Sequence, residues 1–125
     1  MKSFSQLCTD FEKWPKRWMG FPEDIRFGKN IIDIFKPFIK DLIDSKYTEK
    51  TIRRHIDNLW LLGGELIRDV NMDPDLRRSD AFDLMMANIG SDGGPLCRHI
   101  DTESEQRSFD ATCGKLYKFL KRTTG

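Results

Sequence analysis

Residues 31–62 read IIDIFKPFIKDLIDSKYTEKTIRRHIDNLWLL, and their apolar side chains recur at intervals of three and four. In the first half these are Ile31, Ile34, Phe35, Phe38, Ile39, Leu42 and Ile43, and in the second they are Ile52, Ile56, Leu59 and Trp60. Such spacing places the apolar residues on one face of a helix. The stretch therefore predicts two amphipathic helices, one over about 26–45 and one beginning after Thr48, a good N-cap residue.

Two features interrupt these helices. Pro37 lies inside the first, where it removes a backbone donor and disfavours the helical state at Lys36. We therefore expect the first helix to be kinked or broken at Pro37. Gly63 and Gly64 weaken the second helix. The apolar pattern nevertheless resumes at 66–70, so the glycines indicate close packing against a neighbour in preference to a junction.

The sequence before residue 26 predicts a short helix and an aromatic connector. Ser3 and Gln6 have the spacing of a capping box, and Phe4, Leu7, Cys8 and Phe11 follow at helical spacing. Pro15 is expected to end or kink this helix. Trp14, Trp18 and Phe21 then continue as the connector, which either closes the core or, with its neighbouring cations, forms a surface that stacks bases or anchors a partner.

Two more helices are expected after residue 79. Asp80 is a candidate cap for a short helix that carries Met85 and Met86, and 90–95 is a glycine-rich loop. Thr102 and Glu105 form a further capping pair before the last helix. No segment alternates apolar and polar residues as a strand does. The prediction is an all-α fold, a single compact bundle of about five helices over 1–125.

Composition narrows the functional classes. The chain has 125 residues, of which 38% are hydrophobic and 33% charged, with a formal net charge of +1. Neither an N-terminal signal peptide nor an apolar run long enough to cross a bilayer is found. Three widely spaced cysteines fit reduced thiols, so we expect a cytoplasmic protein without membrane contact. Residues 111–125 carry four basic side chains and no acidic one, at Lys115, Lys118, Lys121 and Arg122.

Residues 38–62 carry a resemblance to a known family. An apolar pair, Leu42-Ile43, leads through the polar turn Ser45-Lys46-Tyr47 to the helix start Thr51-Ile52-Arg53. This pattern resembles the core-binding domain of phage-type tyrosine recombinases, a small helical bundle that grips DNA beside the catalytic domain. The resemblance implies DNA binding and an association with recombination or mobile elements. Recombinase activity is not implied, because the family's catalytic pattern of arginine, histidine and tyrosine is not found.

The residues of this stretch suit nucleic acid on physical grounds. Their candidate contacts with nucleic acid are Lys46, Lys50, Arg53, Arg54 and Asn58. The four cations cluster at a helix N-terminus, where free backbone amides also favour a phosphate. Because Lys50, Arg54 and Asn58 recur every four residues, we expect them to share one face, opposite the apolar stripe. Asn58 would then reach a base edge while the cations hold phosphates.

Two other classes of function stay open. One is a protein-interaction module or homodimer that uses the aromatic connector or the Met85-Met86 surface, since flexible Met side chains suit such interfaces. The other is an enzyme or zinc site built on Cys97 and His99. Their one-residue separation is not the spacing of structural zinc sites, and no second ligand pair follows. We therefore expect a non-enzymatic protein with no metal and no cofactor.

Overall fold

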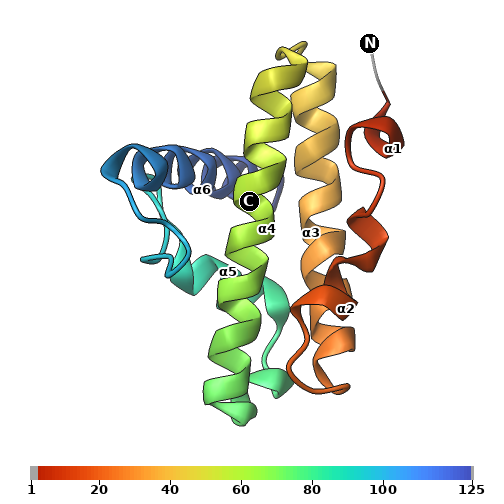
Figure 1. Cartoon of the computed structure of the whole chain (residues 1–125), viewed down its shortest axis with the longest axis vertical. Coiled ribbons are helices and arrows are strands. Elements are labelled where there is room, and N and C mark those ends of the chain that lie inside the picture. The colour runs from red at the N-terminus through yellow and green to blue at the C-terminus, as the bar shows by residue number, and fades with distance from the viewer. Residues whose placement is uncertain (1–2, 125) are drawn as a thin grey trace.

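Two long helices, α3 (Asp24–Asp44) and α4 (Glu49–Met72), lie side by side and run in opposite directions (Figure 1). The structure is a computed structural model that describes the backbone of residues 3–124 and the side chains of residues 3–123. Both helices follow the predicted apolar pattern. Their buried side chains include Phe35, Phe38, Leu59 and Leu66, each at most 1% exposed.

We expected a kink or a break at Pro37, and the break does not occur, because α3 continues through this residue as one helix of 21 residues. The ring of Pro37 removes the hydrogen bond that the carbonyl of Asp33 would accept. Pro37 and Asp33 both lie on the exposed face of α3, so solvent can satisfy that carbonyl. Phe35, Phe38 and Ile39 lie buried around this position. Packing on the buried face therefore outweighs the local preference of the sequence.

A tight turn joins α3 to α4. The backbone N–H groups of Ser45 and Lys46 donate to the carbonyls of Asp41 and Ile43. Lys46 adopts φ 61°, the left-handed conformation that commonly ends a helix. Thr48 is the N-cap of α4, as predicted, and its hydroxyl accepts from the N–H of Thr51 at 3.2 Å. The chain therefore reverses within four residues and exposes Lys46 and Tyr47 at the turn.

The N-terminal segment forms three short elements instead of one helix. These are α1 (Phe4–Leu7), the 3₁₀ turn η1 (Phe11–Lys13) and α2 (Trp14–Trp18). Pro15 does not end a helix there, because it lies in the first turn of α2, where no intrahelical donor is needed. In Figure 1 these elements cover the outer side of α3.

The aromatic connector belongs mainly to the core. The ring of Trp14 lies 5.5 Å from those of both Trp18 and Trp60, measured between centroids. The indole N–H of Trp18 donates to the carbonyl of Trp60 at 3.1 Å. Phe21 is the exception, since it is 51% exposed under the guanidinium of Arg77. Of the two alternatives for the connector, the core role thus holds for the two tryptophans but not for Phe21.

Gly63 provides the close packing that the sequence predicted. A Cβ atom at this position would lie 2.2 Å from the ring of Trp18, so no larger residue fits without a rearrangement. The helix α4 continues through both glycines. The two glycines therefore mark the place where α2 packs against α4, and they do not end the helix.

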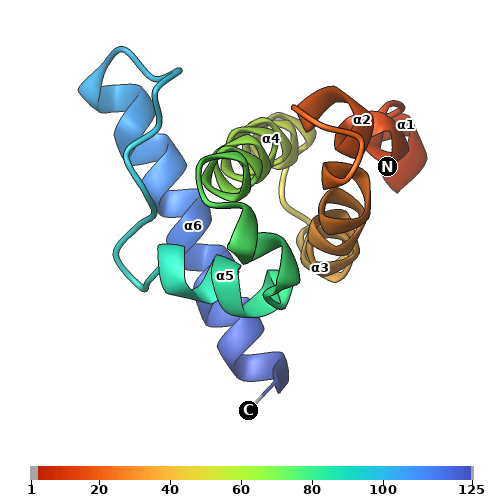
Figure 2. The same cartoon turned by 90° about the horizontal axis from the view of Figure 1, so that it is seen from below.

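The second half of the chain covers the other side of α4. It comprises the 3₁₀ turn η2 (Pro74–Arg78), α5 (Ala81–Asn88) and α6 (Glu103–Thr124). Figure 2 shows α6 on the side of α4 away from α1 and α2. Asp80 caps α5, and Thr102 accepts from the N–H of Glu105 at 3.1 Å, so both predicted caps are confirmed.

The all-α fold is confirmed. Residues 3–124 contain six α-helices, of which α1 and α2 have only four and five residues, and no strand. The loop 90–93 makes a single isolated bridge between Gly90 and Gly93. Among the residues that the structure describes, no helix is both long and apolar enough to span a membrane.

Candidate nucleic-acid interface

The five predicted contact residues do not share one surface. Lys46, Lys50 and Arg54 are exposed at the turn and along the first two turns of α4. Within residues 3–124 their side chains make no hydrogen bond or ion pair, so their charges are not neutralised by a partner there. These three residues therefore stay candidate phosphate contacts, as predicted from their residue types and spacing.

Arg53 points to the opposite side. One guanidinium nitrogen lies 3.4 Å from the carbonyl oxygen of Leu7, at the end of α1. Another lies 3.7 Å from the carboxylate of Glu49. Consecutive residues of a helix diverge by about 100°, so Arg53 and its neighbour Arg54 face different surroundings. Arg53 does not belong with the other cations.

The prediction that Asn58 reaches a base edge is wrong. This residue is only 7% exposed, and its side-chain amide donates to Thr112 Oγ1 at 2.8 Å and to Ser108 O at 3.1 Å. Both acceptors belong to α6. Residue spacing gave the correct face of α4, but it could not reveal that a second helix covers that face. Asn58 is therefore a structural residue between α4 and α6.

His55 extends this buried polar cluster. Its Nδ1 lies 2.7 Å from Thr112 Oγ1, and the residue is 2% exposed. Burial, with the positive charges of Arg54 and Lys115 as smaller causes, lowers the pKa of His55 to about 4. Arg54 adjoins His55 in α4, and Lys115 lies about one turn beyond Thr112 in α6, so these two cations flank the contact between His55 and Thr112.

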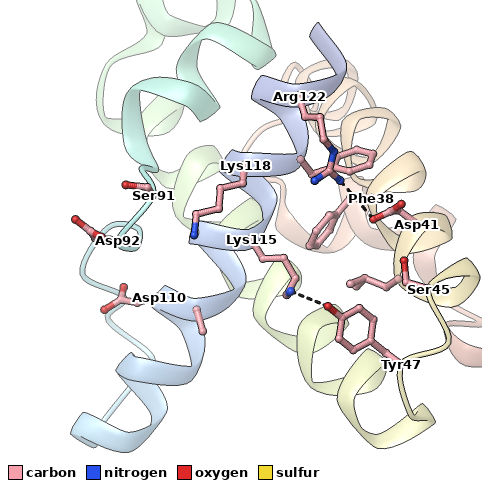
Figure 3. Close-up of a pocket in the computed structure, with 14 residues that line it drawn as sticks. Phe38, Asp41, Ser45, Tyr47, Ser91, Asp92, Asp110, Lys115, Lys118 and Arg122 are labelled. Atoms are coloured by element: carbon pink, nitrogen blue, oxygen red, sulfur yellow. Dashed lines mark hydrogen bonds and ion pairs between the residues drawn. The ribbon is translucent and has the colours of Figure 1, made fainter. Parts of the chain in front are cut away.

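Lys115 connects α6 to the turn that precedes α4. Its ammonium donates to the hydroxyl of Tyr47 at 2.9 Å and lies 4.9 Å from the centre of the Tyr47 ring (Figure 3). Lys118 and Arg122 follow at spacings of three and four residues, on the same face of α6. We name Lys46, Lys50, Arg54, Lys115 and Lys118 the cationic surface. The basic C-terminal run was visible in the sequence, but its proximity to the turn at Tyr47 was not.

A groove of about 460 Å³ adjoins the cationic surface, between α3, α6 and the loop at Ser91. Three carboxylates also line it, and two of them are engaged. Asp41 lies 3.8 Å from the guanidinium of Arg122, and Asp110 accepts from Gly94 N at 3.2 Å. Asp92 is exposed at the far rim, opposite Lys118 (Figure 3). The three carboxylates and the three cations Lys115, Lys118 and Arg122 balance in formal charge, but neither Lys115 nor Lys118 forms an ion pair with a described carboxylate.

The segment with Cys97 and His99 lacks the features of a nucleophilic site. Cys97 is buried and His99 is exposed. Burial raises the pKa of the Cys97 thiol, which disfavours the thiolate that a nucleophile requires. Cys113 is also buried. Among residues 3–124, no three His, Cys, Asp or Glu side chains converge as a metal site.

The Met85-Met86 surface is not present as predicted. Met85 is fully buried at 0% exposure, and only Met86 is partly exposed. Other large apolar side chains are exposed instead, namely Met19, Phe21, Tyr47, Met72 and Leu96. The first two flank Gly20, which lies against Asn71 at the C-terminal end of α4. We name Met19, Phe21 and Met72, the exposed apolar neighbours of Gly20 and Asn71 in sequence, the apolar patch.

Comparison of the chain with protein-family models, curated proteins and solved structures gives no match. The resemblance of residues 38–62 to recombinase core-binding domains therefore stays a prediction from sequence. The geometry of the cationic surface is the independent argument for a function.

Proposed function

We propose that this chain is a small non-enzymatic helical protein that binds nucleic acid through its cationic surface. The observation that carries the proposal is the contact between Lys115 and Tyr47, which brings the cations of α6 to the turn that carries Lys46 and leads into α4. Lys46, Lys50, Arg54 and Lys118 have no described partner that would neutralise them. Phosphate groups provide the complementary charge, and release of their counterions supplies the binding free energy.

The proposed mode of binding is contact with the backbone, without readout of bases. The side-chain amide of Asn58 is suited to a base edge, but it donates a hydrogen bond to Thr112 of α6 instead. Lysine and arginine contacts with phosphates fix position but carry no sequence information. We therefore expect similar affinities for unrelated sequences. An association with recombination or mobile elements is part of the proposal only through the resemblance of residues 38–62.

Fluorescence anisotropy with labelled duplex and single-stranded DNA tests the proposal. If most of the five cations contact phosphates, log K falls with log salt at a slope of about −4 between about 50 and 200 mM. Arg54→Glu and Lys118→Glu should each weaken binding about tenfold, since each removes a contact and adds a repulsive charge. Absence of binding at the low-salt end would contradict the proposal.

Two matched controls make the test specific. Arg53→Glu alters the neighbour of Arg54 but faces α1, so it should change affinity much less. Arg107→Glu reverses an exposed charge on α6 about 16 Å along the helix from Lys118. If all four reversals weaken binding equally, net charge alone is responsible and the cationic surface is not the site.

The apolar patch favours a second candidate, a protein-interaction module or homodimer. Met72 is 70% exposed, and it follows Asn71, against which Gly20 lies between Met19 and Phe21; exposed apolar side chains that group together mark interaction surfaces. A molar mass that rises with concentration, and that Met72→Lys returns to the monomer value, would support this candidate. A constant monomeric mass together with salt-sensitive DNA binding would favour the first.

A further inference from the structure

A second hollow lies on the exposed face of α4, in its C-terminal half. It encloses about 340 Å³ between α2 and the segment 98–99, and it shares only α4 with the cationic surface. Its lining includes Trp18, Trp60, Gly64, Arg68, Arg98 and His99. Aromatic and cationic side chains from three separate parts of the chain thus surround one cleft.

The two glycines of α4 differ in a way that draws attention to this cleft. Residue 63 must be glycine, because the ring of Trp18 occupies the space that a side chain would need. Residue 64 need not be glycine, because a Cβ there would meet Trp18 at 3.6 Å, an ordinary contact. Glycine in the middle of a helix is nevertheless unfavourable relative to alanine. Packing does not account for Gly64, whereas its place in the wall of the cleft does, since any side chain there would narrow the space.

The charges around the cleft leave one cationic side chain, Arg98, without a described partner. Arg17 pairs with Asp10 at 2.8 Å, and Arg68 lies 3.9 Å from the carboxylate of Glu65. Glu65 is buried and also accepts the backbone N–H of Arg98 at 3.0 Å. The side chains of Arg98 and His99 make no hydrogen bond or ion pair with a described residue. The open side of the cleft therefore suits an anion.

We propose that this cleft binds a mononucleotide, with its base against the indoles of Trp18 and Trp60 and its phosphate at Arg98. Indole rings offer a large flat surface for a heterocyclic base. The guanidinium group of arginine matches a phosphate with two parallel hydrogen bonds. The volume lies at the lower end of the range for small-molecule sites, about 300–1,000 Å³. The site is separate from the cationic surface, which holds a polymer by its backbone.

Intrinsic fluorescence provides a direct measurement. The chain has three tryptophans, and Trp14, Trp18 and Trp60 all belong to the cluster beside the cleft. Titration with adenosine monophosphate should change their emission saturably. Adenosine and inorganic phosphate, each supplying half of the ligand, should bind at least about tenfold more weakly if both halves contribute.

Variants separate the cleft from other sites. Arg98→Ala removes the proposed phosphate contact and keeps the backbone N–H that Glu65 uses, so it should weaken binding about tenfold with unchanged helical circular dichroism. Gly64→Leu should fill the space and abolish binding. Arg107→Ala, an exposed arginine elsewhere, should leave binding unchanged.

Two results would overturn the inference. One is the absence of saturable change at millimolar nucleotide. The other is binding that survives both Arg98→Ala and Gly64→Leu. Arg54→Glu distinguishes this inference from the proposed function, since it should reduce DNA binding and leave the response to the nucleotide unchanged.

Discussion

The side of α4 that carries Ile52, Leu59 and Gly63 is apolar and aromatic, and Gly63 lies directly against Trp18 of α2. The side that faces α6 contains His55 and Asn58, which bond to hydroxyl and carbonyl groups of that helix. Apolar packing is strong but tolerant of small shifts, whereas hydrogen bonds need one alignment of donor and acceptor. We therefore expect the apolar side of α4 to supply most of the stability of the fold, and the polar side to fix the register of α6.

This division matters for function because the cationic surface spans the α4–α6 junction. Arg54 belongs to α4, and Lys115 belongs to α6. A shift of α6 along α4 would separate these charges. The buried polar cluster is therefore a structural condition for the proposed site, although none of its members is exposed to a ligand.

Loss of a large core side chain should have the greatest effect. Phe35→Ala deletes a ring that is 0% exposed, and we expect it to lower the free energy of unfolding by about 3–5 kcal/mol. Urea denaturation followed by circular dichroism measures this. Phe21→Ala serves as the control, because that ring is half exposed and should cost about 1 kcal/mol or less. If Phe35→Ala lowered the free energy of unfolding less than a substitution in the polar cluster did, the polar side of α4 would be the one that supplies most of the stability.

Acidification should weaken the α6 side selectively. The pKa of His55 falls from 6.5 to about 4 on folding, so between these values the unfolded chain binds a proton that the folded chain does not. Stability is therefore lost as the pH falls through this interval, by about 3 kcal/mol over its full width. Urea denaturation at a series of pH values gives the slope of the unfolding free energy against pH. His55→Gln removes the titrating group and should flatten it, and an unchanged slope would assign the effect to other groups.

Local signals in the sequence predicted much of the helical framework. Thr48, Asp80 and Thr102 lie where caps were expected, because a cap depends on residues only a few positions away. The close approach at Gly63 was also predicted, but its partner Trp18 was not. The positions of the core helices along the chain thus follow from local sequence signals, whereas the packing of one helix against another does not.

The candidate site shows where such reasoning fails. Periodicity grouped Asn58 with Lys50 and Arg54, but α6 covers the edge of that face. Pro37 was expected to interrupt α3, and tertiary packing overrode it. Lys115 reaches Tyr47 across 68 positions of sequence, a contact that no local pattern encodes. Errors therefore occurred where a distant element decided the environment of a residue.

Loss of a single hydroxyl should test the polar cluster directly. Thr112→Val keeps the shape of the side chain but removes the oxygen that lies within hydrogen-bond distance of His55 and Asn58. We expect a loss of about 1–3 kcal/mol in unfolding free energy, because buried polar groups are left without a partner. Thr112→Ser should restore most of it. Thr123→Val, near the end of the same helix and exposed, should change stability by less than about 0.5 kcal/mol.

The glycine pair should give the smallest effects, and effects of opposite sign. Gly64→Ala introduces a methyl group that fits beside Trp18, so we expect a gain of about 1 kcal/mol from helix propensity alone. Gly63→Ala would place its methyl group against the indole ring, and the strain should outweigh the same propensity gain. Thermal denaturation of the two variants measures the difference. Equal stabilisation by both would mean that α2 moves freely along α4, and the apolar side would then lack the close fit at Trp18. Stabilisation by Gly64→Ala alone would show that residue 64 is kept as glycine at a cost to stability, as expected if the adjoining cleft is used.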